Sequence, residues 1–315
     1  MSGAVGKPLV NVAVAVVQRS DGRVLLAERP QGKVSGGCWE FPGGKFDAGE
    51  RVEQALAREL HEEVGVELDR AHPWMTYEHE YPDKRVRLHF FRVLAWHGEP
   101  HGREGQRISW EDPLALGIGP LLPADARALQ ALSLPQVYAI TQVAKFGIPG
   151  FLRRLERALQ TGVRLILVRE RELAPAQLAQ FTRRVVESAR RYGAMVLVQG
   201  DELLARKAGA DGVHTSGRDL PRRSARPGTR LWSVSCHDSG EIARAADLGA
   251  DFVVLSPVLP TATHPDARPL GWEGFRGMVR DCPVPVYALG GMRPDLLHTA
   301  VSQGAHGIAL ASGIW

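Results

Sequence analysis

Three glutamates at helical spacing are the chemically most informative feature of this sequence. Glu59, Glu62 and Glu63 are related by i, i+3 and i+4, so a helix would project their carboxylates from one face. Carboxylates packed in this way repel one another, and a hard divalent cation relieves the repulsion. Mg²⁺ prefers oxygen ligands and retains water molecules that phosphate oxygens can replace. The spacing therefore predicts a magnesium site for a phosphate-containing substrate, although an isolated pattern of this kind would usually be a solvated acidic helix.

The residues around the glutamates must hold this helix in place. Residues 44–66 read GKFDAGERVEQALARELHEEVGV, and Val52, Leu56 and Leu60 fall on another face that would bury the helix. The guanidinium of Arg58 can pair with a carboxylate and hold it in orientation. Over this segment the chain resembles the Nudix box in full. The matching residues are Gly44, Glu50, Arg58, Glu59, Leu60, Glu62, Glu63, Gly65 and Val66.

The resemblance extends beyond the box, from about Val12 to Leu132, and is to MutT-type 8-oxo-dGTP diphosphatases. Segments typical of that branch are WEFPGGK at 39–45, YEHEYPDKRVRLHFF at 77–91 and WHGEPHGREGQRISW at 96–110. The resemblance implies a bound Mg²⁺, or Mn²⁺. The ligands that it implies are the Gly43 carbonyl and the carboxylates of Glu59, Glu62, Glu63 and Glu104.

The same resemblance implies a reaction. The metal ions polarise the phosphates and activate a bound water, which attacks the β-phosphorus of a nucleoside triphosphate and releases pyrophosphate. Lys45 and Arg29 match basic positions near the phosphates, and Arg58 belongs to the catalytic set. The general base stays open between Glu59 and Glu104, because the carboxylates titrate as a coupled set.

Substrate choice depends on weaker signals. Asp125, in LLPADARALQAL, stands where bacterial MutT-type enzymes carry an asparagine that reads the oxidised guanine. An ionised aspartate accepts hydrogen bonds from guanine N1–H and N2–H, but it cannot donate to O6 as an amide can. The alternative is that Asp125 caps the N-terminus of a helix. Phe41 either contacts the base or belongs to the core.

The sequence changes character near residue 134. We expect a first domain over residues 1–133, a linker at 134–136 and a second domain over residues 137–315. The resemblance implies that the first is a Nudix α/β/α sandwich with a mixed sheet. Strands are expected there at Val10–Val17, Val24–Ala27 and Val86–Trp96, and a second amphipathic segment at Ala124–Leu132.

In the second half, short apolar strands alternate with helical runs. This alternation predicts a (β/α)8 TIM barrel, and the absence of GxGxxG after the first strand disfavours an open doubly wound sheet. The expected strands are Val137–Thr141, Arg164–Arg169, Ala194–Gln199, Gly212–His214, Leu231–Ser235, Phe252–Leu255, Val286–Leu289 and Gly307–Ala309. The expected helices are Phe151–Gln160, Ala176–Tyr192, Glu241–Leu248 and Arg293–Gln303.

Residues 137–315 resemble the thiamine phosphate synthase and TenI-like thiazole tautomerase superfamily. The resemblance is carried by ADGVH at 210–214, SVSCH at 233–237, SPVLPTATH at 256–264, ALGGM at 288–292 and GIALASGI at 307–314. It implies a phosphate site for a thiazole phosphate, built partly from backbone N–H groups after the last two strands. The residues expected to bind this ligand are Arg169, Thr261, Thr263, Gly290, Gly291, Ser312 and His237.

Other positions depart from the synthase pattern. Gln199 and Gly200 stand where the synthases carry an Asn-Asp pair that includes a magnesium ligand, and His264 replaces a lysine. Leu167, Arg169 and Arg171 replace a Q-x-R-x-K pattern, and of two metal carboxylates Asp219 remains. We therefore expect ligand binding without synthase activity. His237 aligns with the catalytic histidine of the tautomerase, which leaves tautomerisation or a ligand-sensing role open.

Composition sets the remaining expectations. The chain of 315 residues is 44% hydrophobic and has three cysteines, Cys38, Cys236 and Cys282, which suggest a reducing, cytoplasmic environment. No secretory signal or membrane span is apparent. The net charge of +4 suits an anionic small substrate. Arginine pairs such as Arg183–Arg184 lack accompanying aromatic RNA-binding motifs, so we expect no stable nucleic-acid binding. A hydrolase of thiamine-pathway pyrophosphates is the main alternative function.

Overall fold

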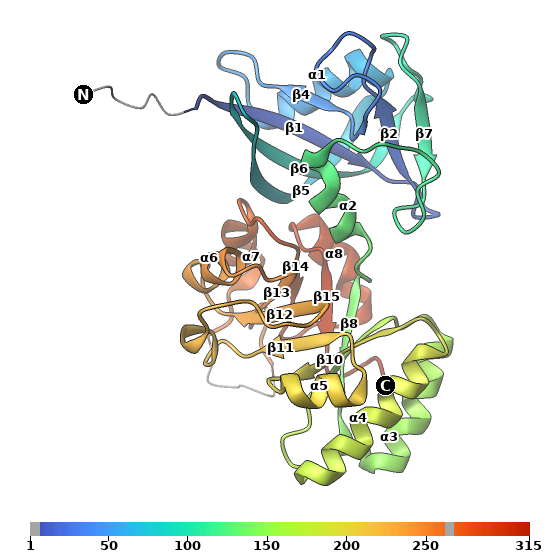
Figure 1. The fold of residues 1–315 in the computed structure, drawn as a ribbon, viewed down its shortest axis with the longest axis vertical. Coiled ribbons are helices and arrows are strands. Elements are labelled where there is room, and N and C mark those ends of the chain that lie inside the picture. Colours follow the sequence, from blue (N-terminus) through green and yellow to red (C-terminus); the bar gives the residue numbers. More distant parts are fainter. Residues whose placement is uncertain (1–6, 262–267) are drawn as a thin grey trace, which may run out of the picture. The chain divides into compact units, whose positions relative to one another are not determined.

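The computed structural model describes residues 7–261 and 268–315. The chain forms two compact units that divide between Ser133 and Leu134. Figure 1 shows a first unit made mainly of strands, with α1 beside them, and a second unit in which strands and helices alternate.

The first unit contains two sheets and two α-helices. A four-stranded sheet has the order β4-β1-β6-β5, and a three-stranded sheet has the order β3-β2-β7. In the larger sheet β1 pairs parallel with β6 and antiparallel with β4, so the sheet is mixed, as predicted. The strands are β1 (Leu9–Val17), β2 (Val24–Glu28), β3 (Trp39–Glu40), β4 (Gly43–Lys45), β5 (Glu67–Glu80), β6 (Arg85–His97) and β7 (Ile108–Glu111). The helices are α1 (Val52–Val64), the 3₁₀ turn η1 (Pro123–Asp125) and α2 (Ala126–Leu132).

Alternating side chains along β1 build a core on each side of the sheet. Ala13, Ala15 and Val17 pack in the cluster that contains the buried face of α1. Val14 and Val16 belong to the opposite cluster, which contains α2 residues. The period of two in a strand places successive residues on opposite faces. This two-sided burial confirms the layered α/β/α arrangement.

Helix α1 is fixed by its apolar face and by its ends. Leu56 and Leu60 are fully buried, together with Ala55 and Val64. Gly65 ends the helix in the left-handed conformation, with φ of 71°, which costs glycine little. The remaining face of the helix is free to carry charge toward β4.

The second unit is a closed barrel of eight parallel strands. The last strand in sequence, β15, pairs with β8, and β8 pairs with β9, so the sheet has no open edge. This closure confirms the predicted (β/α)8 barrel and excludes the open sheet. The strands are β8 (Val137–Ile140), β9 (Leu165–Val168), β10 (Met195–Gln199), β11 (Gly212–Thr215), β12 (Leu231–Cys236), β13 (Phe252–Leu255), β14 (Val286–Ala288) and β15 (Gly307–Leu310). The helical segments are α3 (Val143–Gln160), α4 (Pro175–Arg190), α5 (Glu202–Ala208), η2 (Leu220–Arg222), α6 (Ser239–Asp247), α7 (Gly271–Val279), η3 (Pro294–Leu296) and α8 (Leu297–Ser302).

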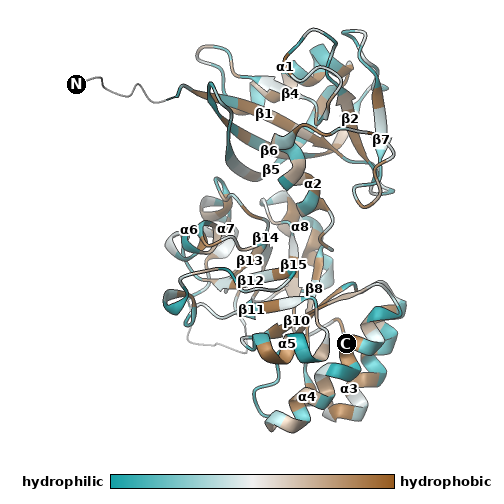
Figure 2. Cartoon of the chain, viewed as in Figure 1, coloured by the Kyte–Doolittle hydropathy of each residue, from teal (hydrophilic) through white to brown (hydrophobic). Residues whose placement is uncertain are grey.

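Apolar side chains fill the barrel inside and outside. One cluster, including Tyr138, Phe252 and Tyr287, fills its interior. Two others lie between the strands and the surrounding helices. Hydrophilic and hydrophobic residues alternate along α3 and α4 in Figure 2, as expected for helices with one buried face. Within residues 7–261 and 268–315, every helix is too short or too polar to span a bilayer.

Residues 134–136 pack with the second unit. The Leu134 side chain is buried, and its carbonyl oxygen lies 2.8 Å from His306 Nε2. The Tyr287 hydroxyl donates a hydrogen bond of 2.5 Å to the Pro135 carbonyl. These contacts tie the segment to β14 and β15 within the barrel.

Candidate active site

Two glycines allow β4 to approach both β1 and α1. Gly43 has φ of 153°, and a Cβ atom there would lie 2.1 Å from the Ala13 carbonyl oxygen. A Cβ atom on Gly44 would lie 2.1 Å from Cδ of Glu59. A side chain at either position would therefore displace the strand or the carboxylate, which explains the requirement for glycine.

Arg58 lies at the centre of the carboxylate cluster. Its Nη2 donates to Glu50 Oε2 over 2.9 Å, and its Nη1 donates to Glu59 Oε1 over 2.9 Å and to Glu62 Oε2 over 3.1 Å. The same side chain reaches the Lys45 carbonyl oxygen, 3.0 Å away. These carboxylates raise the pKa of Arg58, so it stays charged. Arg58 therefore orients three acidic side chains and links α1 to β4.

Glu63 is the one of the three glutamates that does not pair with Arg58. Its Oε2 accepts a hydrogen bond of 3.0 Å from the Gly43 amide. Burial raises its pKa to about 8, and the charges of Glu40, Glu59 and Glu104 act in the same direction. Burial also raises the pKa of Glu59, partly offset by Arg58. Burial and the neighbouring carboxylates therefore disfavour the ionised form of Glu63 as long as no cation is bound.

This donor set fits a hard divalent cation. Burial makes the ionised forms of Glu59 and Glu63 costly until a cation is nearby, and their carboxylate oxygens are the hard ligands that Mg²⁺ prefers. In the described part of the chain, however, no three His, Cys, Asp or Glu side chains converge into a ready-made metal cage. Arg58 pairs with two of the candidates instead. The residues thus fit a cation that takes its remaining ligands from water and phosphate oxygens.

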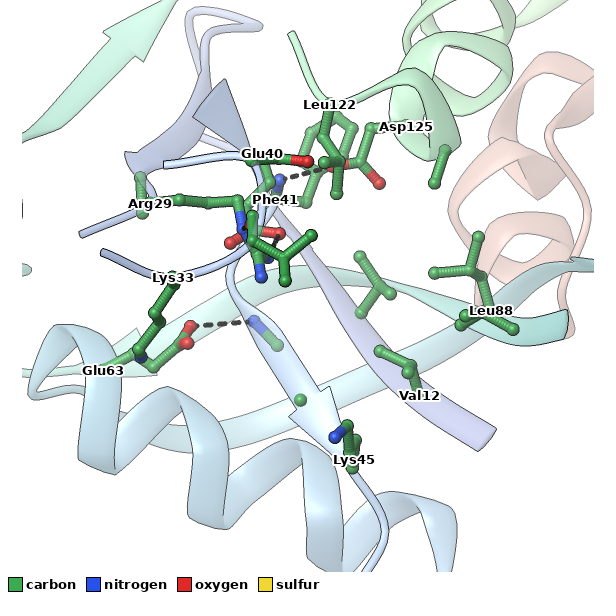
Figure 3. A pocket seen from close by; sticks show the side chains of 18 of the residues that line it. Val12, Arg29, Lys33, Glu40, Phe41, Lys45, Glu63, Leu88, Leu122 and Asp125 are labelled. Carbon is green, nitrogen blue, oxygen red and sulfur yellow. Dashed lines mark hydrogen bonds and ion pairs between the residues drawn. The ribbon is translucent and has the colours of Figure 1, made fainter. Parts of the chain in front are cut away.

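A cavity of about 390 Å³ connects the carboxylates with an apolar compartment. This volume lies within the range of small-ligand sites. Figure 3 shows Glu63 and Lys45 at one end and Asp125 and Leu122 at the other. The structure brings most of the predicted residues into this lining, namely Arg29, Phe41, Gly43, Lys45, Glu59, Glu63, Glu104 and Asp125. Arg58 and Glu62 are not part of the lining, and the Glu62 side chain is 56% exposed.

Asp125 lies at the far end of this cavity and is fully buried. Although it precedes α2, its side chain makes no capping hydrogen bond, so the capping interpretation is wrong. Its Oδ2 instead accepts a hydrogen bond of 3.0 Å from the Phe41 amide. Burial, followed by the charge of Glu40, raises the pKa of Asp125 to about 8. The raised pKa therefore favours the protonated form of Asp125 at pH 7, and a protonated carboxyl group has an O–H donor that an ionised one lacks.

Phe41 is both a core residue and a cavity-lining residue. Its side chain is buried, lies in the core cluster on the α2 side of the sheet and also lines the cavity. Its ring stands edge-on to Phe90, with the ring centroids 6.3 Å apart.

Several lining residues were not anticipated. Lys33 pairs with Glu104, and Glu40 forms a short ion pair with Arg29. Tyr81 and Lys84 come from the turn between β5 and β6. Glu40, Tyr81 and Lys84 lie in the segments 39–45 and 77–91 that resemble MutT-type enzymes. This resemblance was the signal that could have identified them.

The expected phosphate site of the barrel lies among loops that follow its strands. Gly290 and Gly291 have φ of 94° and 66°, and a Cβ atom on either would meet residues 257–260 at 2.8 Å or less. Close packing is therefore sufficient reason for both glycines. Ser312 is exposed after β15, and Thr261 is half-buried after β13. Thr263, like His264, lies outside the described residues.

A polar chain crosses the barrel interior, and sequence reasoning did not single it out. The ring nitrogens of His214 lie 2.7 Å from Ser233 Oγ and 2.7 Å from Ser235 Oγ. Ser233 Oγ in turn lies 3.4 Å from the Tyr138 hydroxyl. Burial, with a smaller effect of the Arg169 charge, lowers the pKa of His214 to about 3. His214 is therefore a neutral member of this hydrogen-bonded chain. It is also the last residue of the ADGVH segment at 210–214.

The other predicted barrel residues differ in burial and in their contacts. Arg169 is half-buried, and desolvation lowers its pKa. His237 is exposed, and its Nδ1 lies 2.7 Å from the Ser256 carbonyl oxygen. The Ser216 hydroxyl donates to Asp219 Oδ2 over 2.6 Å, and Arg222 lies 3.9 Å from its Oδ1. Asp219 thus accepts a hydrogen bond from Ser216 and has only a weak, exposed ion pair with Arg222.

The fold and the glutamate helix define a Nudix pyrophosphohydrolase joined to a TIM barrel. A NUDIX domain model matches residues 7–132, and a model described as thiamine monophosphate synthase matches residues 137–314. The chain belongs to both families. Its first unit is 40% identical over 126 residues to the 8-oxo-dGTP diphosphatase of Haemophilus influenzae, which covers 40% of this chain and 93% of that protein.

Two further relatives bear on the two units. The CTP pyrophosphohydrolase of Escherichia coli is 37% identical over 123 residues, covering 39% of this chain and 90% of that protein. The thiamine-phosphate synthase of Chloroflexus aurantiacus is 31% identical over 163 residues, covering 51% of this chain and 76% of that protein. The pyrophosphohydrolase relatives thus differ in the base of the nucleotide that their names specify.

Proposed function

We propose that the first unit hydrolyses 8-oxo-dGTP to 8-oxo-dGMP and pyrophosphate with Mg²⁺ or Mn²⁺, and so removes a mutagenic nucleotide. The observation that carries the proposal is one cavity with acidic residues at one end and buried Asp125 at the other. The separation suits a nucleotide whose phosphates and base bind at different ends. Similarity to the Haemophilus influenzae enzyme supports the choice of the oxidised base.

A neutral Asp125 provides the hydrogen bonds that such a base requires. A protonated carboxyl group has one O–H donor and retains an acceptor oxygen. Because Oδ2 accepts from the Phe41 amide, the proton belongs on Oδ1. Oδ1–H can then donate to guanine O6, while Oδ2 accepts from N1–H. In this arrangement the acid replaces the amide of the related enzymes.

The chain's own residues prepare the phosphate end. A bound Mg²⁺ would supply charge neutralisation on the phosphates and an acidified water. Glu59 and Glu63 would hold the cation, with Glu104 and the Gly43 carbonyl in the same cavity. Arg58 keeps Glu59 oriented, and Lys45 contributes positive charge toward the phosphates. Glu59 and Glu104 remain the two candidates for accepting the proton of the attacking water.

The barrel, we propose, binds a phosphorylated thiazole without thiamine phosphate synthase activity. Gly200 provides no carboxylate where the related synthases bind magnesium, and Asp219 is occupied by Ser216 and Arg222. One carboxylate holds magnesium poorly. Membership of the synthase family keeps synthesis as the alternative. Exposed His237 keeps tautomerisation open.

A panel of substrates tests the hydrolase proposal. Pyrophosphate release should be measured from 8-oxo-dGTP, dGTP, CTP, thiamine pyrophosphate and hydroxymethylpyrimidine pyrophosphate. We expect the highest kcat/KM for 8-oxo-dGTP. A higher value for either thiamine-pathway compound would support the alternative that the synthase-family barrel suggests.

A further inference from the structure

The loop between β2 and β3 forms part of the cavity rim. Pro30, Lys33, Val34 and Ser35 of this loop line the cavity. Backbone hydrogen bonds between Arg29 and Cys38 (2.8 Å) and between Gly37 and Arg29 (3.0 Å) close its base. Its tip is exposed, and Val34 in particular is 77% exposed. The loop therefore has a fixed base and a tip with few packing restraints.

Lys33 connects this tip to the acidic end of the cavity. Its Nζ lies 2.8 Å from Glu104 Oε2, and the two side chains are 52% and 43% exposed. The hydrogen bond to Glu104, with smaller effects of the Glu104 and Glu63 charges, raises the pKa of Lys33. The ammonium group thus lies in the field of the two carboxylates that the proposed metal site includes.

Glu104 is itself anchored to the glutamate helix. Gln106 accepts a hydrogen bond of 2.8 Å from the Glu104 amide and donates one of 2.8 Å to the Glu63 carbonyl oxygen. The Lys33–Glu104 pair consequently joins the rim loop to α1. Arg29, another cation in the cavity lining, is already engaged by Glu40 and by the Val34 carbonyl. Lys33 is the more readily released of the two.

We propose that Lys33 is an exchangeable counter-charge for the Nudix site. Without metal, the Lys33 ammonium group neutralises Glu104. With metal and nucleotide bound, the ammonium group leaves Glu104 and pairs with a phosphate oxygen of the nucleotide. A divalent cation beside Glu104 and Glu63 repels the ammonium group, and the incoming phosphates offer it new negative charge. The flexible stem and compact charge of lysine suit such a transfer. This inference deepens, and depends on, the proposed metal-dependent hydrolysis.

The proposal predicts that Lys33→Ala strengthens metal binding and weakens nucleotide binding. Binding of Mn²⁺ without nucleotide should tighten by about two- to fivefold, because a half-exposed competing ion pair is lost. The KM for 8-oxo-dGTP at saturating Mg²⁺ should rise by at least the same factor, because a phosphate contact is lost, while kcat changes little. Calorimetry measures the first quantity and pyrophosphate release the second. The matched control is Lys7→Ala, which removes the Lys7–Glu80 pair outside the cavity.

Each possible result with the Lys33 variants either supports or overturns the proposal. Unchanged Mn²⁺ affinity or unchanged KM in Lys33→Ala overturns the proposal, because it requires both shifts. Lys33→Arg should stay nearer the wild type than Lys33→Ala does; equal effects would assign the result to loop shape and also overturn it. Failure of the wild-type protein to bind Mn²⁺ would instead overturn the proposed metal site.

Discussion

Replacing Asp125 tests the proposed base contact and its protonation state together. Asp125→Ala removes an O–H donor and an acceptor from the cavity and leaves the buried Phe41 amide without its partner. Neutral hydrogen bonds contribute about 0.5–1.5 kcal/mol each, so the loss of two should reduce kcat/KM for 8-oxo-dGTP by about 1–3 kcal/mol. That energy corresponds to roughly 5- to 150-fold. Asp125→Asn retains a donor and an acceptor, so its activity should stay close to that of the wild type at pH 7.

The pH dependence distinguishes a neutral acid from a carboxylate. The pKa of Asp125 is raised to about 8, so the O–H donor is present below that pH and lost above it. Wild-type kcat/KM for 8-oxo-dGTP should therefore fall, relative to Asp125→Asn, as the pH rises through about 8. Taking the ratio of the two proteins cancels titration of the substrate itself.

A substrate without a base provides the control for this assay. Hydrolysis of deoxyribose triphosphate should be insensitive to Asp125→Ala, because the phosphate end is unchanged. Two results would refute the reasoning about Asp125. One is an 8-oxo-dGTP kcat/KM for Asp125→Ala within about twofold of wild type, and the other is a constant ratio between wild type and Asp125→Asn from pH 6 to 9.

Three further predictions address the glutamate helix, the glycine turn and the barrel. Glu63→Gln should lower kcat by about 10²-fold or more at saturating Mg²⁺, with melting temperature measured in parallel; near-normal turnover would remove Glu63 from the metal site. Gly44→Ala should displace the Glu59 carboxyl group, whose Cδ would lie 2.1 Å from the new Cβ atom. We expect kcat to fall while the melting temperature stays close to that of the wild type; wild-type kinetics would contradict this. The pKa of His214 is lowered from 6.5 to about 3, so the unfolded state binds the proton more tightly and barrel stability should decline as the pH falls below about 6.5. Urea unfolding should show this decline in wild type and less of it in His214→Gln; equal pH dependence in both would exclude His214 as its source.

Local patterns were sufficient to predict much of the fold. The eight barrel strands were all anticipated because most are short, mainly apolar runs that are buried on both faces. Strand β5 was missed, since Glu67, Asp69 and Arg70 give its first part a polar composition. The short helix α5 was missed as well, because it buries little besides Ala205.

The site was predictable where its residues are close in sequence. Glu59 and Glu63 follow from helical spacing, but the partner of Asp125 is Phe41, 84 residues away. The Lys33–Glu104 pair spans 71 residues. The burial that raises the pKa of Asp125 also depends on tertiary packing, so the protonated form that it favours could not be predicted from the sequence. Long-range contacts of this kind are what a single sequence conceals.

The cavity of the first unit and the barrel differ in how their charged residues are arranged. The cavity of the first unit concentrates carboxylates near Lys45 and Lys33, an arrangement that favours a cation and can then stabilise a departing pyrophosphate. In the barrel, Ser216 and Arg222 already engage Asp219, and desolvation makes charged Arg169 less favourable. Release of pyrophosphate requires compensation of several negative charges, whereas binding a monophosphate requires much less. We therefore infer that cleavage of a pyrophosphate belongs to the first unit and that the barrel binds a monophosphate. Growth of a strain that lacks thiamine phosphate synthase, supported by the full chain without added thiamine, would overturn that division.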